Sequence, residues 1–125
     1  MIGNIQNTNP NFGSLRISPD KVTKKAIVQY VDSMETARIM GNAINKLGDE
    51  TDNIPVLIKG DIIPDLSDTT GKNFSILLSA FNNENSQEAL SKIAVKKGDF
   101  QTSRANLFEK FADEIITKIK TFMSR

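Results

Sequence analysis

The sequence predicts an α+β domain of two layers, in which a small antiparallel sheet of three or four strands is packed by helices. The first observation is that polar and apolar residues alternate in short runs, the pattern of half-buried strands. The second is that apolar residues elsewhere return every three or four positions, as on one side of an amphipathic helix. The third is the order of these stretches, β-α(α)-β-β-β-α, whose short connections favour antiparallel neighbours.

Length and composition limit the class of protein. A chain of 125 residues has the usual size of one domain, and we assign residues 13–125 to it. Its apolar content of 38% and charged content of 25% are typical of globular proteins. Residues 1–12 are rich in asparagine, and we expect them to form a disordered or frayed segment. A leader for an export system that accepts polar N-termini is the alternative for this segment.

Missing residue types exclude several kinds of chemistry. The chain has no cysteine and no histidine, which excludes disulfides, zinc–thiolate sites and a Ser–His–Asp triad. We expect no Sec-type signal peptide, because the first residues lack a basic start and an apolar core. No apolar run reaches roughly 20 residues, the length of a membrane span. We therefore expect a cytoplasmic protein without membrane contact. Sixteen basic and fifteen acidic residues give a net charge of +1, so the chain as a whole does not attract polyanions.

The first strand and the first helix follow directly on one another. Residues 14–17 alternate polar and apolar side chains and predict a short strand. Ser18 supplies a hydroxyl that can cap a helix, and Pro19 stands where a missing N–H costs nothing. Asp20 then places a negative charge near the positive end of the helix dipole.

The helical pattern that continues to residue 47 predicts a break. Its apolar residues form two stripes rotated by about a quarter turn, more than one straight helix can present to a single core. Between the stripes, Asp32 and Glu35 have the spacing of a capping box. We expect two helices, or one helix broken near Asp32, and we expect Gly48 to end the second.

Three more strands are expected downstream. Residues 54–59 form a nearly continuous apolar run, typical of a buried strand. Residues 74–81 and 89–97 alternate, and the asparagine-rich residues 82–85 between them predict an antiparallel hairpin. In the first strand of this hairpin, Leu77 and Phe81 point away from the face that carries Phe74, Ile76, Leu78 and Ala80.

A long amphipathic helix closes the chain, from about residue 103 to 123, with Thr102 or Ser103 as its cap. Its apolar residues cover about half of the helix circumference and need a sheet to cover: Leu107, Phe108, Phe111, Ile115, Ile116, Ile119, Phe122 and Met123. Its outward face interleaves acidic and basic residues, which indicates a solvated face.

The connector before residue 74 contains the only cluster of acids that invites a chemical role. Asp61, Asp65 and Asp68 do not fit a calcium loop, because the sixth and twelfth positions hold leucine and lysine in place of glycine and glutamate. Gly71 and Lys72 lack the other glycine and the hydroxyl of a phosphate-binding loop. We therefore predict a turn-rich connector, and no catalytic, cofactor or metal site. The protein is not expected to be an enzyme.

Five basic residues suggest an alternative function: Lys24, Lys25, Lys96, Lys97 and Arg104. They belong to the first helix, the end of the last strand and the start of the closing helix. Because the net charge is close to zero, they would have to meet on one face to hold a polyanion. Nucleic-acid binding through these residues, with double-stranded RNA as the ligand, is the alternative reading.

The order helix–strand–strand–strand–helix over residues 19–123 is similar to that of double-stranded-RNA-binding domains. In that family a glycine-rich turn and a lysine-rich helix start hold phosphates across the grooves. Gly98 and the pair Ser103-Arg104 stand at the corresponding place, but residues 105–107 are Ala-Asn-Leu where the family has further basic residues. The resemblance lies in the order of the elements and does not extend to the motif.

The leading prediction is a non-catalytic protein that acts through protein–protein contacts. Leu77 and Phe81 make the second face of their strand partly apolar, and an uncovered apolar face is a natural docking patch. The partner is expected to be another protein or a second copy of the chain, bound through the sheet or through its helices.

Overall fold

Four strands and three helices make up the part of the chain that the computed structural model describes, residues 15–50, 55–82, 88–99 and 101–123. In chain order they are β2 (Leu15–Ile17), α1 (Lys21–Tyr30), α2 (Met34–Glu50), β3 (Val56–Pro64), β4 (Phe74–Phe81), β5 (Ala89–Lys96) and α3 (Arg104–Met123). The predicted α+β class and element order are confirmed. The expected N-terminal segment and most of the asparagine-rich turn lie outside the described residues.

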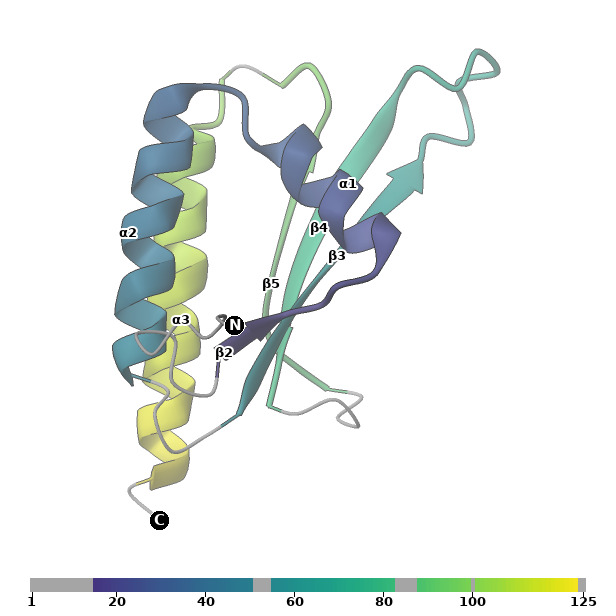
Figure 1. Ribbon diagram of the computed structural model, residues 1–125. Coiled ribbons are helices and arrows are strands. Elements are labelled where there is room, and N and C mark those ends of the chain that lie inside the picture. Colours follow the sequence, from purple (N-terminus) through teal and green to yellow (C-terminus); the bar gives the residue numbers. More distant parts are fainter. Residues whose placement is uncertain (1–14, 51–54, 83–87, 100, 124–125) are drawn as a thin grey trace, which may run out of the picture.

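The strands form one mixed sheet in the order β2-β3-β4-β5 (Figure 1). The pairs β3–β4 and β4–β5 are antiparallel, as expected, whereas β2 pairs with β3 in parallel. The parallel pair arises because α1 and α2 carry the chain back before β3 begins, and such a crossover returns it in the same direction. The sheet is therefore mixed where a wholly antiparallel one was expected.

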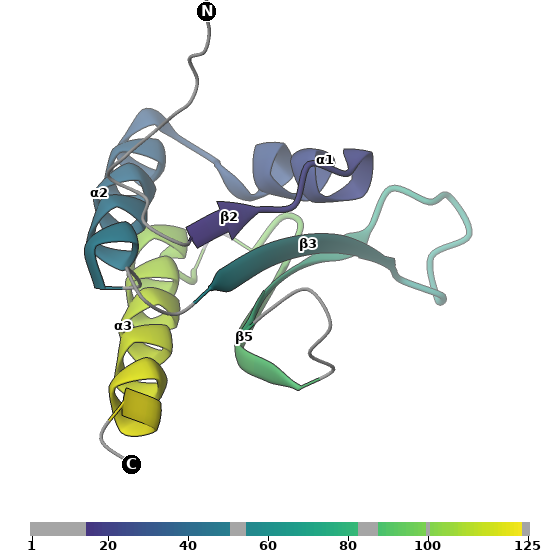
Figure 2. The ribbon, with the colours of Figure 1, turned by 60° about the horizontal axis from the view of Figure 1, so that its bottom comes forward.

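The helices form the second layer. Figure 1 shows α2 and α3 side by side, running in the same direction, and ion pairs link Lys46 to Asp113 and Glu50 to Lys120 along their length. The helix α3 packs on β5, while α1 crosses β3 and β4 (Figure 2). The largest fully buried side chains come from both layers: Tyr30, Phe108, Phe111, Leu47, Ile76, Leu78, Ile115, Ile119 and Val56.

Gly60 allows α1 to approach the sheet closely. A Cβ atom at this position would lie 2.7 Å from the Cβ of Ala26, too close for two carbon atoms. The hydroxyl of Thr23 in α1 accepts a hydrogen bond from the Gly60 N–H at 3.1 Å and lies 3.3 Å from the Gly60 carbonyl oxygen. The pairing of β2 with β3 ends at Ile58, and beyond it a side chain of α1 bonds the backbone of β3.

The start of α1 depends on a carboxylate. Asp20 is the N-cap and accepts a hydrogen bond from the Thr23 N–H at 2.7 Å. Ser18, expected to cap, instead donates its hydroxyl to the Asp20 carboxylate. The bonds from Ser18 and Thr23 lower the pKa of Asp20 to about 2. The carboxylate is the better cap here because it accepts from several donors at once.

The predicted break between the first two helices is confirmed. The helix α1 ends at Tyr30 and α2 begins at Met34. Ser33 accepts a hydrogen bond from the Thr36 N–H at 3.1 Å and is the cap expected at Asp32. Asp32 instead accepts from the Thr36 hydroxyl at 2.6 Å.

Two expected boundaries are wrong. The helix α2 continues through Gly48, which is buried, and ends at Glu50. A glycine inside a helix costs less than about 1 kcal/mol, which favourable packing can offset. The strand β3 runs on to Pro64, because β4 pairs with it along its whole second half. Gly60 and Asp61 therefore lie inside β3, beyond the strand end expected at residue 59.

Candidate interaction surface

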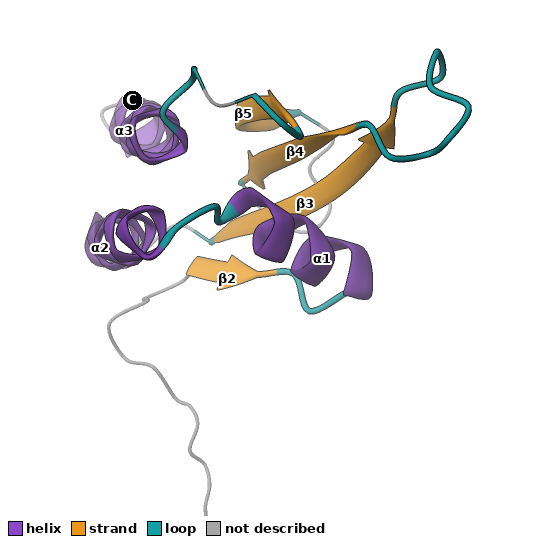
Figure 3. Ribbon diagram, turned by 90° about the horizontal axis from the view of Figure 1, so that it is seen from above, coloured by secondary structure: helices purple, strands orange, loops and turns teal. Residues whose placement is uncertain are grey.

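The candidate surface is the side of the sheet that α1, α2 and α3 leave uncovered, and we name it the helix-free face. Side chains alternate between the two sides of a strand, so the register assigns each residue to one face. Figure 3, seen from above, shows how α2 and α3 stand beside the sheet while α1 lies against β3. The helix-free face carries Arg16, Leu57, Lys59, Asp61, Ile63, Ser75, Leu77, Ser79, Phe81, Lys92, Ala94 and Lys96.

Basic residues dominate the charge of the helix-free face. Lys59 and Lys92 flank Ser79 in one row across three strands, which separates their Cα atoms by about 10 Å. Lys96 lies four residues further along β5 and Arg16 lies on β2. Among the residues that the structure describes, the strands thus place four cations and one carboxylate, that of Asp61, on this face.

Apolar side chains lie between these cations. Leu77 and Phe81, the expected interaction patch, are both on the helix-free face and both half-buried. Leu57 beside Phe81 is buried, while Ile63 at the far end of β3 is 45% exposed. The ammonium of Lys59 lies 5.7 Å from the centre of the Phe81 ring, a cation–π contact. The face is therefore amphipathic.

A hollow of about 450 Å³ opens where the helix-free face meets the β3–β4 loop, and we name it the loop hollow. Figure 1 shows this loop projecting beyond the helices. Ile63, Ser75 and Lys96 belong to both the hollow and the helix-free face. The rest of the lining consists of Pro64, Asp65, Leu66, Ser67, Asn73, Phe74 and Lys97.

The loop beside the hollow is organised by two aspartates. Asp65 accepts hydrogen bonds from the hydroxyl and the N–H of Ser67, which lower its pKa. Asp68 accepts from the hydroxyl and N–H of Thr70 and from the Asn73 N–H, and its pKa falls to about 2. Both carboxylates are engaged in the turn. Among the described residues, no group of His, Cys, Asp or Glu is arranged to hold a metal ion.

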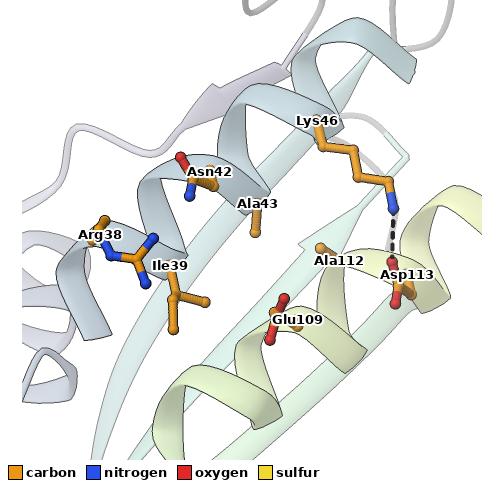
Figure 4. Close-up of a pocket in the computed structure, with 8 residues that line it drawn as sticks. All are labelled: Arg38, Ile39, Asn42, Ala43, Lys46, Glu109, Ala112 and Asp113. Carbon is orange, nitrogen blue, oxygen red and sulfur yellow. Dashed lines mark hydrogen bonds and ion pairs between the residues drawn. The ribbon is translucent and has the colours of Figure 1, made fainter. Parts of the chain in front are cut away.

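A second pocket, of about 410 Å³, lies between α2 and α3 (Figure 4). Its lining comprises Arg38, Ile39, Asn42, Ala43, Lys46, Glu109, Ala112 and Asp113. Both signs of charge face each other across it, and Lys46 pairs with Asp113 at 3.4 Å while both side chains stay about 60% exposed. Exposed pairs of this kind are worth about 0.2–1 kcal/mol. The pocket is a solvated groove between two helices.

The five basic residues expected to hold nucleic acid do not gather on one face. Lys24 and Lys25 are exposed on α1, on the helix side, whereas Lys96 lies on the helix-free face. The ammonium of Lys97 lies 5.2 Å from the ring centre of Phe74 at the loop hollow.

Arg104 is buried and turned inward. Its Nη1 donates hydrogen bonds of 2.9 Å to the carbonyl oxygens of Gln29 and Tyr30, the last two residues of α1. The Tyr30 hydroxyl donates to the Arg104 carbonyl oxygen at 2.6 Å, and burial raises the Tyr30 pKa. Arg104 thereby satisfies the end of α1, where a cation is favoured by the helix dipole. This arginine holds α1 against α3.

Sequence reasoning did not find Lys59, Ile63 and Leu66 as surface residues. The sequence pattern ends the strand at Lys59 and predicts a connector that contains Ile63 and Leu66. The sequence signal that could have placed Ile63 is the alternation of side chains, continued beyond Gly60. The β3–β4 register shows that Asp61 and Ile63 lie on the same side of the sheet as Leu77. In the described part of the chain, no helix is both long and apolar enough to cross a membrane.

Comparisons of the chain with protein-family models, with curated proteins and with solved structures found no match.

Proposed function

We propose that this protein is a non-catalytic binding protein that contacts another protein through the helix-free face. The observation that carries the proposal is the combination of half-buried Leu77 and Phe81 with four cations on one sheet face. A sheet covered by helices on one side usually presents polar residues on the other. Because β4 carries apolar side chains on both sides, we expect a partner to cover the helix-free face when the protein is bound. The cytoplasmic location expected from the sequence stays a prediction.

Site-specific photo-crosslinking tests the proposal. A benzoylphenylalanine placed at Ala94 lies on the helix-free face beside Leu77, since these residues pair directly. The control places the same group at Asn45, exposed on α2. In extract of the source organism, the Ala94 probe is expected to give a discrete protein adduct that unlabelled protein competes away. The adduct should weaken when Leu77→Gln is added.

Equal adducts from both positions would contradict the proposal, since they would show contact without preference for this face. A covalent dimer of the chain, together with a concentration-dependent mass in light scattering, would identify the partner as a second copy. Adducts that disappear on nuclease treatment would favour the second candidate.

Nucleic-acid binding is that second candidate, supported by the cations on the helix-free face. Lys59, Lys92 and Lys96 lie within reach of one backbone, and only Lys96 was among the residues first expected to bind nucleic acid. Each phosphate contact makes the affinity fall with salt. Gel shifts with duplex and single-stranded RNA at about 50 mM salt, where such contacts are strong, test it. Absence of any complex there would exclude it.

A further inference from the structure

We infer that the partner presents an acidic segment with large apolar side chains, and that one of these enters the loop hollow while the acids of the segment meet the lysines beside it. The inference rests on the proposed function and adds the chemistry of the partner. Three features support it: exposed apolar side chains line the hollow, lysines lie next to it, and the helix-free face has few aromatic side chains on which nucleic-acid bases could stack.

The apolar part of the hollow is unusually open. Leu66 is 95% exposed and Ile63 is 45% exposed, and both line the hollow with Phe74. Large apolar residues at such exposure are stabilised when a partner removes them from water, by about 25 cal/mol per Å². At about 450 Å³ the hollow falls within the range of ligand-binding clefts. It therefore has room for a side chain of the size of leucine or phenylalanine.

The charges next to the hollow are complementary to acids. Lys96 and Lys97 border it together with one acid, Asp65, whose carboxylate is bonded to Ser67. Lys92 lies four residues before Lys96 on the same strand, so basic residues outnumber the acid here. The Cα atoms of Lys92 and Lys96 are thus about 13 Å apart. An extended chain spans the same distance in four residues, so acids at alternate positions of a partner segment can meet both lysines. Complementary charge of this kind mainly raises specificity and association rate.

The same surface is poorly suited to nucleic acid. Phe81 is the single aromatic residue among the described side chains of the helix-free face, and Lys59 already lies over its ring. Single-stranded recognition generally uses several aromatic platforms for base stacking. A protein segment, with spaced charges and apolar side chains, fits these features better.

The test is a titration of the isotope-labelled full chain followed by NMR. The probe is a blocked octapeptide of sequence Glu-Glu-Glu-Leu-Phe-Glu-Glu-Glu. Its controls are the same peptide with both apolar residues replaced by glycine, the same peptide with lysine for glutamate, and a single-stranded oligouridine. The acidic apolar peptide is expected to shift the amide signals of residues 63–66, 74–75 and 96–97. The control peptides should shift them less at equal concentration.

Matched variants sharpen the result. The double variant Lys96→Gln/Lys97→Gln should weaken binding of the acidic peptide about threefold to tenfold, the effect of losing two exposed ion pairs. Lys24→Gln/Lys25→Gln removes the same charge from the helix side and should leave the affinity unchanged. Leu66→Ser should weaken it about fivefold through lost apolar contact. All five positions are exposed, so the variants are expected to stay folded.

The outcomes separate the two proposals. If photo-crosslinking finds a protein on the helix-free face but neither the acidic peptide nor the lysine variants show an effect, the inference about the partner is wrong and the proposed function stands. If both the peptide and the crosslinking fail, both are wrong. Stronger binding of oligouridine than of the acidic peptide would also overturn the inference.

Discussion

The two faces of the sheet come from the same strands but differ in almost every physical property. On the covered face, Gly60, Leu78 and Ile93 form one row without a charge, and each is buried. On the helix-free face, the neighbouring row is Lys59, Ser79 and Lys92. A period of two residues along each strand is enough to keep these surfaces apart. We therefore expect substitutions on the covered face to lower the stability of the fold. Substitutions on the helix-free face should change stability less and affect the proposed binding.

The largest difference is expected between Phe111→Ala and Leu77→Ala. Phe111 is 1% exposed in the core under the helices, so its truncation should cost about 3–5 kcal/mol of unfolding free energy. Leu77 on the helix-free face is half-buried, so its truncation should lower the unfolding free energy by only about 1 kcal/mol. Urea denaturation of the two variants measures both values. Equal losses would mean that the helix-free face is as much a core as the covered one.

The second comparison uses two identical substitutions, Gly60→Ala and Gly41→Ala. The new Cβ atom at Gly60 would meet Ala26 at 2.7 Å and should cost about 1–3 kcal/mol by overpacking. At Gly41, exposed in α2, nothing lies within 4 Å, and alanine should stabilise the helix by about 0.5–1 kcal/mol. The effect on the unfolded chain is the same in both, so thermal midpoints compare the folded sites directly. Changes of the same sign would contradict the close approach of α1.

A smaller effect is expected for Tyr30→Phe, which removes only the hydroxyl bonded to the Arg104 carbonyl oxygen. One hydrogen bond of this kind contributes about 1 kcal/mol. Lys59→Gln on the helix-free face should stay within about 0.5 kcal/mol, as surface substitutions usually do. Chemical denaturation of both variants tests the pair. No loss in Tyr30→Phe would show that the ring alone fixes α1 against α3.

The smallest effect concerns pH and the two aspartates with pKa values near 2, Asp20 and Asp68. Each binds protons less readily in the folded chain than in the unfolded one. Their contribution to stability is therefore complete above about pH 4, the ordinary aspartate range, and is lost as the pH falls toward 2. Asp20→Asn should flatten this part of the pH–stability curve, measured as the urea midpoint. NMR titration of either carboxyl near its ordinary value would contradict the hydrogen bonding at that site.

Local signals predicted most of the elements. The strand of residues 74–81 and the separation of its two faces followed from alternation alone, because strand geometry is local. Ser103 caps α3 by accepting from the Asn106 N–H, one of the two caps that were expected. The break near Asp32 was visible because two apolar stripes cannot share one straight helix.

Features set by distant contacts were not predictable in this way. Gly60 and Asp61 look like a strand end, and only the pairing with β4 and the approach of α1 show that they are not. Arg104 looks like a free cation at a helix start, yet it binds carbonyl groups 74 and 75 residues away. The parallel pairing of β2 depends on where two helices return the chain. The candidate surface was found only in part, because Leu77 and Phe81 were expected while Ile63 and Leu66 were not.

The parallel pairing of β2 also has a consequence for the order in which the molecule assembles. The contacts among β3, β4 and β5 join near neighbours in sequence, whereas Leu15 must find Val56 across two helices. Closing the longer loop costs more chain entropy, so we expect β2 to dock after the other strands have paired. Until β2 docks, the apolar run Val56–Ile58 is an open strand edge, the kind that pairs with other chains. We expect the time before β2 arrives, rather than the finished fold, to be when this protein is most prone to aggregate.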